Sequence, residues 1–414
     1  MTNEPERRVA VGIVGCVAKL ASAVFATEGN VWDELFASLM SLSQNPNPAA
    51  RAINFSLLEQ LAETIAPKLK PHMATIAQLL TTGCADPEQQ VKIGAMKACV
   101  AMITHTSDSV EVMALEPILP PLIAVMQHCL QAGEEELVSE AMDVVQECAS
   151  MEQPLINNHI DALIPFIVSI LENKEFEEQI KQSATYALIQ IIENRPKLIG
   201  KKNMVPPILN AMVGLIAAAD GKEVSSLFQI GSGEGHLDEE ADDEEYDEEE
   251  GLASRNPQYI LDTLAMAIPS KYFVQPALAV ASQCISAADP QHRKAGCFLL
   301  GVITEGCADS LRIILEQILP AVLTAVKDPE YFVREVACFT LGQMSEHCQP
   351  EILHYHSSIL PVIFGALDDE RPNVQNTICY VLEFFCENLQ PETLKPHLEL
   401  LLTKLCNLLN SPSK

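Results

Sequence analysis

The sequence predicts an all-α fold: a right-handed α-α superhelix, or solenoid, built from repeats of two helices. When the segment 311–391 is displaced onto itself so that Pro320 falls on Pro361, Cys338 also falls on Cys379. Within each copy, apolar residues recur at the three-and-four spacing of a half-buried helix. Apolar residues make up 48% of the chain, and no strand-like alternating runs stand out. A period of about 40 residues with helical patterning indicates stacked two-helix repeats, in which each pair buries its apolar stripe against its neighbours.

One repeat shows how the two helices are specified. The first helix is expected at 313–326 and contains Pro320, which removes one backbone hydrogen bond and bends the helix. The pair Asp328-Pro329 then favours a helix start, because aspartate caps helices and proline suits the first helical position. The second helix is expected at 331–347, and Gln349-Pro350 ends it.

The proline of the first helix recurs along the chain and locates an insertion. It is found at Pro120, Pro165, Pro206, Pro276, Pro320 and Pro361. The step from Pro206 to Pro276 is much longer than the other steps, each of which is close to one repeat period. The excess is the segment 221–251, which the pattern places between the two helices of one repeat. We predict that this acidic insertion is disordered.

The remaining elements follow in order, as one solenoid over residues 1–414 that is cut within a repeat at both ends. The expected order is a second helix at 7–27, helix pairs at 30–66, 70–105, 117–151 and 159–194, the interrupted pair at 197–268, pairs at 270–306, 309–347 and 352–389, and a first helix at 392–410. The pattern therefore favours a fragment or a truncated gene model. Unpartnered helices at the two ends would leave apolar surface open, so we expect self-association.

Composition limits the kinds of partner. The formal net charge is −30, with 56 acidic and 26 basic residues. Such a chain repels nucleic acids and anionic membranes and attracts basic proteins. No continuous apolar run is long enough to span a membrane, so we expect no membrane insertion. The 13 cysteines include no Cys-x-x-Cys pair, which favours a reducing compartment and buried thiols.

The acidic insertion is the first candidate binding segment. A solvated, disordered loop that aids solubility is one interpretation. The other is that the loop attracts a basic partner at close range, because physiological salt screens charges beyond roughly 8 Å. Its eleven carboxylates are Asp238, Glu239, Glu240, Asp242, Asp243, Glu244, Glu245, Asp247, Glu248, Glu249 and Glu250.

The second candidate is a polar helix face at 376–387. Asn376, Tyr380, Glu383 and Glu387 follow one another at spacings of four, three and four residues, so they share one side of a helix. A generic solvated face is one interpretation. A docking face is the alternative, with carboxylates and an aromatic ring for lysine or arginine.

No enzyme, metal site or cofactor is predicted. The glycine-rich run 231–235 follows no predicted strand and is followed by no Gly-Lys-Ser/Thr, so it is not a phosphate-binding loop. His347, Cys348, His354 and His356 straddle a turn without zinc-site spacing. No nucleophile, base and orienting group form a recognisable catalytic set.

The repeats resemble those of a known family. The segments 333–346 (Val-Arg-Glu-Val-Ala-Cys-Phe, then Leu-Gly-Gln-Met-Ser-Glu) and 382–389 (Leu-Glu-Phe-Phe-Cys-Glu-Asn-Leu) are similar to the HEAT-repeat signature of the importin-β (karyopherin-β) family. The similarity is sharpest from 292 to 389 and is nearest to the importin-four and yeast Kap subfamily. An acidic insertion within one repeat is also a trait of the family.

The resemblance implies a nuclear transport receptor that shuttles between cytoplasm and nucleus. Such receptors hold basic cargo on their second helices, bind the Ran GTPase through N-terminal repeats and the acidic loop, and touch phenylalanine-glycine nucleoporins with their first helices. The subfamily implies histones and ribosomal proteins as cargo. The chain departs from the family in lacking the opening repeats and the C-terminal half. The alternative function is a HEAT-repeat scaffold or a chaperone for basic proteins outside transport.

Overall fold

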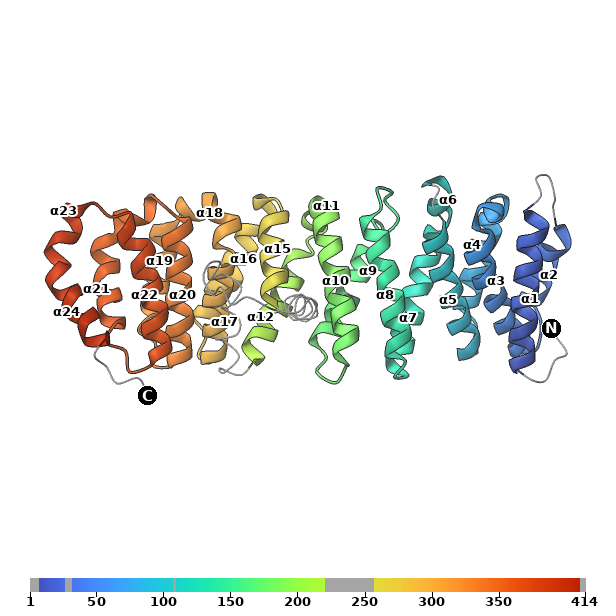
Figure 1. The fold of residues 1–414 in the computed structure, drawn as a ribbon, viewed down its shortest axis with the longest axis horizontal. Helices are drawn as coiled ribbons and strands as arrows, with labels where there is room; N and C mark the ends of the chain where they lie inside the picture. Colours follow the sequence, from blue (N-terminus) through green and yellow to red (C-terminus); the bar gives the residue numbers. More distant parts are fainter. Residues whose placement is uncertain (1–6, 27–31, 107–108, 220–256, 410–414) are drawn as a thin grey trace, which may run out of the picture. The chain divides into compact units, whose positions relative to one another are not determined.

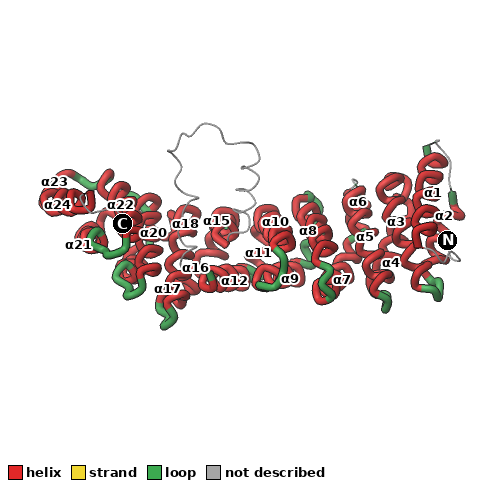
Figure 2. The backbone as a smooth tube through the Cα atoms, turned by 60° about the horizontal axis from the view of Figure 1, so that its bottom comes forward, coloured by secondary structure: helices red, strands yellow, loops and turns green. Residues whose placement is uncertain are grey.

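The computed structural model describes residues 7–26, 32–106, 109–219 and 257–409, and every regular element in them is helical (Figures 1 and 2). These residues form two compact units, 1–195 (unit 1) and 196–414 (unit 2). The prediction of an all-α fold built from stacked helical repeats is confirmed. We call the first helix of a repeat its A helix and the second its B helix.

Unit 1 consists of successive A and B helices that pack on their counterparts in the next repeat. The A helices pack in the order α2, α4, α7 and α9, and the B helices in the order α1, α3, α5, α8 and α10. The A elements are α2 (Asp33–Ser43), η1 (Lys70–His72) with α4 (Met73–Cys84), α6 (Ser109–Ala114) and η2 (Glu116–Ile118) with α7 (Leu119–Gln131), and α9 (Ile160–Glu172). The B helices are α1 (Arg7–Phe25), α3 (Pro48–Leu69), α5 (Gln89–His105), α8 (Glu135–Ser150) and α10 (Glu178–Asn194).

Unit 2 continues the same alternation. B helices α17, α20 and α22 pack in series, and α15 packs against α12 and α18. The A elements are α11 (Pro196–Lys201) with α12 (Val205–Ala218), α16 (Ser270–Ile285), α19 (Leu315–Ala325), η3 (Glu351–Tyr355) with α21 (His356–Ala366), and α23 (Pro391–Leu394) and η4 (Lys395–His397) with α24 (Leu398–Leu409). The B elements are α15 (Pro257–Ala267), α17 (Pro290–Val302) with α18 (Thr304–Arg312), α20 (Tyr331–His347) and α22 (Pro372–Glu387).

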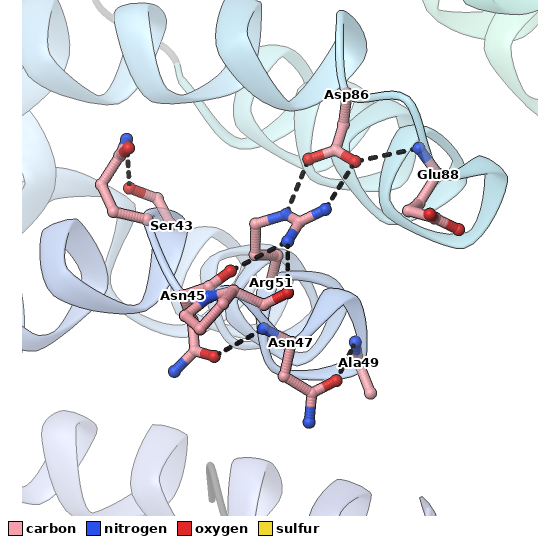
Figure 3. A network of polar contacts seen from close by, with 9 residues as sticks. Ser43, Asn45, Asn47, Ala49, Arg51, Asp86 and Glu88 are labelled. Carbon is pink, nitrogen blue, oxygen red and sulfur yellow. Dashed lines mark hydrogen bonds and ion pairs between the residues drawn. The ribbon is translucent and has the colours of Figure 1, made fainter.

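Arginine–aspartate pairs join the B helix of one repeat to the turn before the next B helix. In Figure 3, Arg51 donates from Nε and Nη2 to the two oxygens of Asp86, at 2.8 and 2.9 Å, and from Nη1 to the carbonyl of Asn45 at 2.8 Å. Asp86 also accepts the amide hydrogen of Glu88. Two-pronged, charge-assisted bonds of this kind fix the relative position of the two elements. The same arrangement recurs in unit 2 as Arg293–Asp328 and Arg334–Asp369.

These pairs correct one prediction about helix starts. The expected capping pair is confirmed at Asp289, which accepts the amide hydrogen of Gln291, with Pro290 in the first turn of α17. It is wrong at Asp86 and Asp328, because α5 and α20 begin three residues after each aspartate. At those positions the carboxylate closes a local turn and holds an arginine of the preceding repeat.

The prolines expected inside the A helices occupy two kinds of position. Four of the six lie inside their A helices, as expected: Pro165, Pro276, Pro320 and Pro361. Pro120 and Pro206 instead lie in the first turn of α7 and α12, where the missing N–H has no partner to lose.

Three of the differences between expected and observed helix boundaries occur at a proline or at a break in the helix. Helix α3 continues through Pro67 to Leu69, with non-helical backbone angles at Ile65 that accommodate the proline. Helix α18 crosses the expected repeat boundary near 306–309, after a break at Ile303. The last expected A helix is broken at Lys395-Pro396-His397, which form the short 3-10 helix η4 between α23 and α24.

Helices α12 and α15 flank the expected insertion and pack against each other. Lys294 of α17 is 1% exposed, and its Nζ donates to the carbonyl of Ala219, one residue after α12 ends, at 2.7 Å. A buried ammonium group requires such a partner. The predicted disorder of 221–251 lies outside the described residues.

Within the described residues, Glu111–Gln131 is long and apolar enough to cross a membrane by length and composition, and half of it is buried within the protein. Its apolar side chains, such as Leu122 and Met126 of α7, belong to the core of unit 1. The sequence pattern did not indicate the segment because Glu116 and the prolines interrupt it.

Candidate partner-binding face

Three aromatic residues at the same position of successive repeats set the rotation of the B helices in unit 2. Phe298 and Phe339 stack with ring centroids 6.0 Å apart, and Tyr380 follows at the same position in α22. The ring of Tyr380 lies directly on Gly342, where an added Cβ would meet it at 2.7 Å. Phe339 lies on Gly301 in the same way, at 2.8 Å. These close contacts fix which side of each B helix faces outward.

Tyr380 is bound to the preceding repeat through its hydroxyl group. The hydroxyl donates to Oε2 of Glu346 at 2.6 Å and accepts from Nε2 of Gln343 at 3.2 Å. Burial and the hydrogen bond to the Glu346 carboxylate raise the pKa of Tyr380 above its ordinary value. The ring also meets Phe384 edge to face, with centroids 4.8 Å apart. Tyr380 is therefore a fixed neutral donor that orients the Glu346 carboxylate.

A row of carboxylates lies beside these rings. Glu305, Glu346 and Glu387 occupy one position in three successive B elements, α18, α20 and α22. Glu383 and Glu387 are exposed in α22, and Glu305 is exposed in α18. Packed helices lie about 8–10 Å apart, so the row offers one carboxylate at roughly that interval. We call Glu305, Glu346, Glu383 and Glu387, with the half-buried Asp262 of α15, the carboxylate row.

Two members of the carboxylate row, Asp262 and Glu305, repel each other. Burial, and then the neighbouring charge of Glu305, raises the pKa of Asp262. Arg293 and Arg334, on the same B helices, are bound to Asp328 and Asp369 instead. Over the described part of the chain, the basic group that meets the row is His347, which lies 3.9 Å from Glu346. A basic side chain from a partner would relieve this repulsion.

Unit 1 carries a weaker counterpart on α3, α5 and α8. Lys97 of α5 lies 3.8 Å from Glu140 of α8. Burial raises the pKa of Glu59 in α3, and Lys97 partly opposes this. Burial also raises the pKa of Asp143 in α8, with a contribution from Glu140. An internal lysine thus already occupies this acidic surface, so unit 2 presents the stronger attraction for cations.

The four residues predicted to share a polar face do lie on one side of α22, but they differ in availability. Asn376, Glu383 and Glu387 are exposed, whereas Tyr380 is half-buried against α20. Sequence reasoning did not include Glu305, Glu346 or Asp262 in the face. The repeat offset would have found the first two, because Glu387 displaced by one and two repeats falls on them.

The other residues considered from the sequence have simpler outcomes. The eleven acidic residues at 238–250 lie outside the described residues. His347 and His356 bind neighbouring protein groups, the Glu346 carboxylate and the carbonyl of Leu353. Within the described residues, no group of three histidine, cysteine or acidic side chains could hold a metal ion.

Comparisons with known proteins converge on one group. The family model described as IPO5-like, TPR repeats matches residues 6–166, and the HEAT repeat model matches residues 318–348. Importin-4 of Mus musculus is 25% identical over 326 residues, which cover 77% of this chain and 29% of the mouse protein. Importin subunit beta-3 of Saccharomyces cerevisiae is 26% identical over 298 residues, covering 72% of this chain and 26% of the yeast protein. The crystal structure of Kap121p bound to RanGTP is 25% identical, with a TM-score of 0.72, over 92% of this chain and 36% of that chain.

Proposed function

Since the chain belongs to the importin-β family, we propose that it forms part of a nuclear transport receptor and holds basic cargo segments against the carboxylate row of unit 2. The chain spans less than a third of the length of the mouse and yeast importins that it matches. The proposal therefore concerns the part of the receptor that these residues form. Such a receptor would move between cytoplasm and nucleus without catalysing a reaction.

The observation that carries the proposal is the repeated position of Glu305, Glu346 and Glu387 on neighbouring B helices. Their spacing suits an extended basic segment lying across the helices, because a strand advances about 3.3 Å per residue and reaches the next helix after about three residues. Tyr380 and Phe384 add aromatic faces on which cations bind. Histone tails and ribosomal proteins supply segments of this chemistry.

Regulation by the Ran GTPase is the second part of the proposal. Kap121p was crystallised bound to RanGTP, and this chain matches it over 92% of its own length. The acidic run 238–250 carries eleven carboxylates in thirteen residues and would attract basic surfaces of Ran or of cargo. We further propose that A helices contact phenylalanine-glycine nucleoporins, as the family resemblance implies.

Charge reversal in the carboxylate row tests cargo binding. Binding of a lysine-rich histone-tail peptide is measured by fluorescence anisotropy for the parent chain and for Glu383→Lys. Reversing a contacting charge costs on the order of 1–3 kcal/mol, so the affinity should fall about 5- to 150-fold. Glu316→Lys is the matched control, since Glu316 is an exposed carboxylate on the A helix α19. If both variants weaken binding equally, the loss of affinity is caused by the change in net charge and not by a contact of Glu383. If Glu383→Lys binds the peptide as tightly as the parent, the face is only a solvated surface.

A Ran experiment separates the receptor from a HEAT-repeat scaffold or a chaperone for basic proteins. GTP-loaded Ran should release the bound peptide, whereas GDP-loaded Ran should not. Replacing Asp238–Glu250 by a Gly/Ser linker of equal length should slow association with Ran or cargo and flatten its dependence on salt. Peptide that stays bound in the presence of GTP-loaded Ran would favour the scaffold or chaperone.

A further inference from the structure

A second charged surface, of opposite sign to the carboxylate row, lies where the A elements of unit 2 begin. Lys197 and Lys201 lie four residues apart on α11, so they project from one side of that helix. Lys271 lies in the first turn of α16, and all three lysines are exposed. In a chain with 56 acidic and 26 basic residues, a cluster of lysines requires an explanation.

The ring of Tyr272 lies between helix α11 and the side chain of Lys271. Gly200 lies between Lys197 and Lys201 on α11. The ring of Tyr272 packs so closely on the backbone at Gly200 that an added Cβ would overlap ring atom Cδ2. The ammonium group of Lys271 lies 4.7 Å from the centroid of the same ring. The contact between α11 and α16 therefore places the backbone that carries Lys197 and Lys201 beside the ring that Lys271 covers.

The backbone around this cluster is well defined. Helix α11 closes with a hydrogen bond from the amide of Met204 to the carbonyl of Ile199 at 3.0 Å, and Asn203 adopts a left-handed conformation with φ of 54°. This is the geometry of a closed helix end, in which asparagine tolerates positive φ. The positions of Lys197 and Lys201 on α11 follow from this closed turn and from the Tyr272 contact.

Some lysines of the chain are held by carboxylates. Lys70, Lys97 and Lys404 pair with Glu111, Glu140 and Asp368, respectively. Within the part of the chain that the structure describes, no carboxylate lies within ion-pair distance of Lys197, Lys201 or Lys271. All three ammonium groups can therefore still pair with an anionic partner.

We propose that Lys197, Lys201 and Lys271, which we call the lysine cluster, form a docking surface for an acidic protein segment. The cluster is small: one helical turn and one neighbouring helix end. An extended segment of about four to six residues would cover it, at about 3.3 Å per residue. A short acidic segment meets the lysines and little else, whereas a long nucleic acid would also meet the strongly negative remainder of the chain. This surface is independent of the proposed cargo face, and it would give the receptor a partner of the opposite charge.

The test measures binding of a fluorescein-labelled octapeptide of alternating aspartate and glutamate to the full chain at about 50 mM salt, where the screening length exceeds about 10 Å. The cluster variant is Lys197→Gln with Lys201→Gln and Lys271→Gln. The control is Lys68→Gln with Lys327→Gln and Lys395→Gln, three exposed lysines elsewhere with the same change in net charge. Circular dichroism melting checks that both variants fold.

We expect the cluster variant to lose at least about tenfold in affinity and the control less than about twofold, because exposed ion pairs each contribute modestly and add up over three contacts. Peptide affinity of the parent should fall steeply between about 50 and about 300 mM salt, because added salt shortens the screening length. Equal losses in the two variants, or no binding by the parent at low salt, would overturn the proposal. So would a single-stranded oligonucleotide of equal charge that binds as tightly as the peptide.

Discussion

The arginine–aspartate pairs make a sharp prediction about how one repeat is joined to the next. Arg334 donates to the two oxygens of Asp369 at 2.6 and 2.9 Å and to the carbonyl of Asp328 at 3.1 Å. At the equivalent position of the next repeat the chain carries Gln375, whose Nε2 donates to the carbonyl of Asp369 at 2.7 Å. Arg334→Gln should therefore keep the local turn contact and remove the pair with Asp369.

The magnitude follows from burial and geometry. The side chains of Arg334 and Asp369 are 13% and 9% exposed. Breaking a fully buried pair costs about 3–5 kcal/mol, and a single charge-assisted bond contributes about 1.5–3 kcal/mol. Asp369 keeps the hydrogen bond from the amide of Arg371, at 2.9 Å, and gains some hydration. We expect Arg334→Gln to destabilise the contact between α20 and α22 by about 2 kcal/mol, below the fully buried range.

The effect should depend on pH with a definite sign. Burial alone would raise the pKa of Asp369, but the hydrogen bonds from Arg334 and the amide of Arg371 outweigh it and lower the pKa. A lowered pKa means that the stabilisation is present above the unfolded value, near pH 4, and is lost as the pH falls through the folded value. The difference between parent and variant should therefore be constant above about pH 5 and shrink below about pH 4.

Native-state hydrogen exchange is the suitable assay, because it reports the opening free energy of each helix in a repeat protein. Peptides covering α20 and α22 are followed at pH 7 and, after correction for intrinsic rates, at pH 3.5. Lys327→Gln, which removes an exposed positive charge, is the control. A variant within about 0.5 kcal/mol of the parent at pH 7, or a loss of the same size at both pH values, would refute the role assigned to the pair.

Three further outcomes are expected. Gly342→Ala should lower the stability of the contact between α20 and α22 by about 1–3 kcal/mol in thermal melts, because its Cβ would lie 2.7 Å from the Tyr380 ring. Gly214→Ala is the control and should be neutral or stabilising, because the space around Gly214 is open. In an alkylation experiment read by mass spectrometry, the exposed Cys16 and Cys406 should be modified first. Burial shields the thiols of Cys148 and Cys297 from the reagent and raises their pKa to about 12. Early labelling of Cys297 would contradict the expected order. Leu398→Glu with Leu402→Glu should reduce self-association in light scattering, since both leucines are exposed on α24, and an unchanged mass would show that this surface drives no association.

Local sequence information was sufficient for most of the helices. The boundaries of α20, Tyr331–His347, agree with the sequence prediction residue for residue. Three-and-four periodicity and prolines are properties of single segments, and a helix responds to them before it meets any neighbour. The same local signals erred where a neighbour intervened. Asp328 has the composition of a cap, but it binds Arg293 of the preceding repeat, and α20 begins three residues later.

For the candidate face, too, single-helix geometry was predictable from the sequence and contacts between helices were not. The spacing of Asn376, Glu383 and Glu387 was enough to place them on one exposed side of α22, since that depends on the geometry of one helix. That Tyr380 lies on Gly342 and binds Glu346 depends on which helix packs beside α22 and at what rotation. The lysine cluster likewise joins Lys197 and Lys201 to Lys271 only through the contact of Gly200 with Tyr272. The sequence alone therefore determined the repeat, its helices and their charge, whereas tertiary packing decided which side chains meet, because contacts between repeats depend on the relative placement of helices that no single-helix pattern encodes.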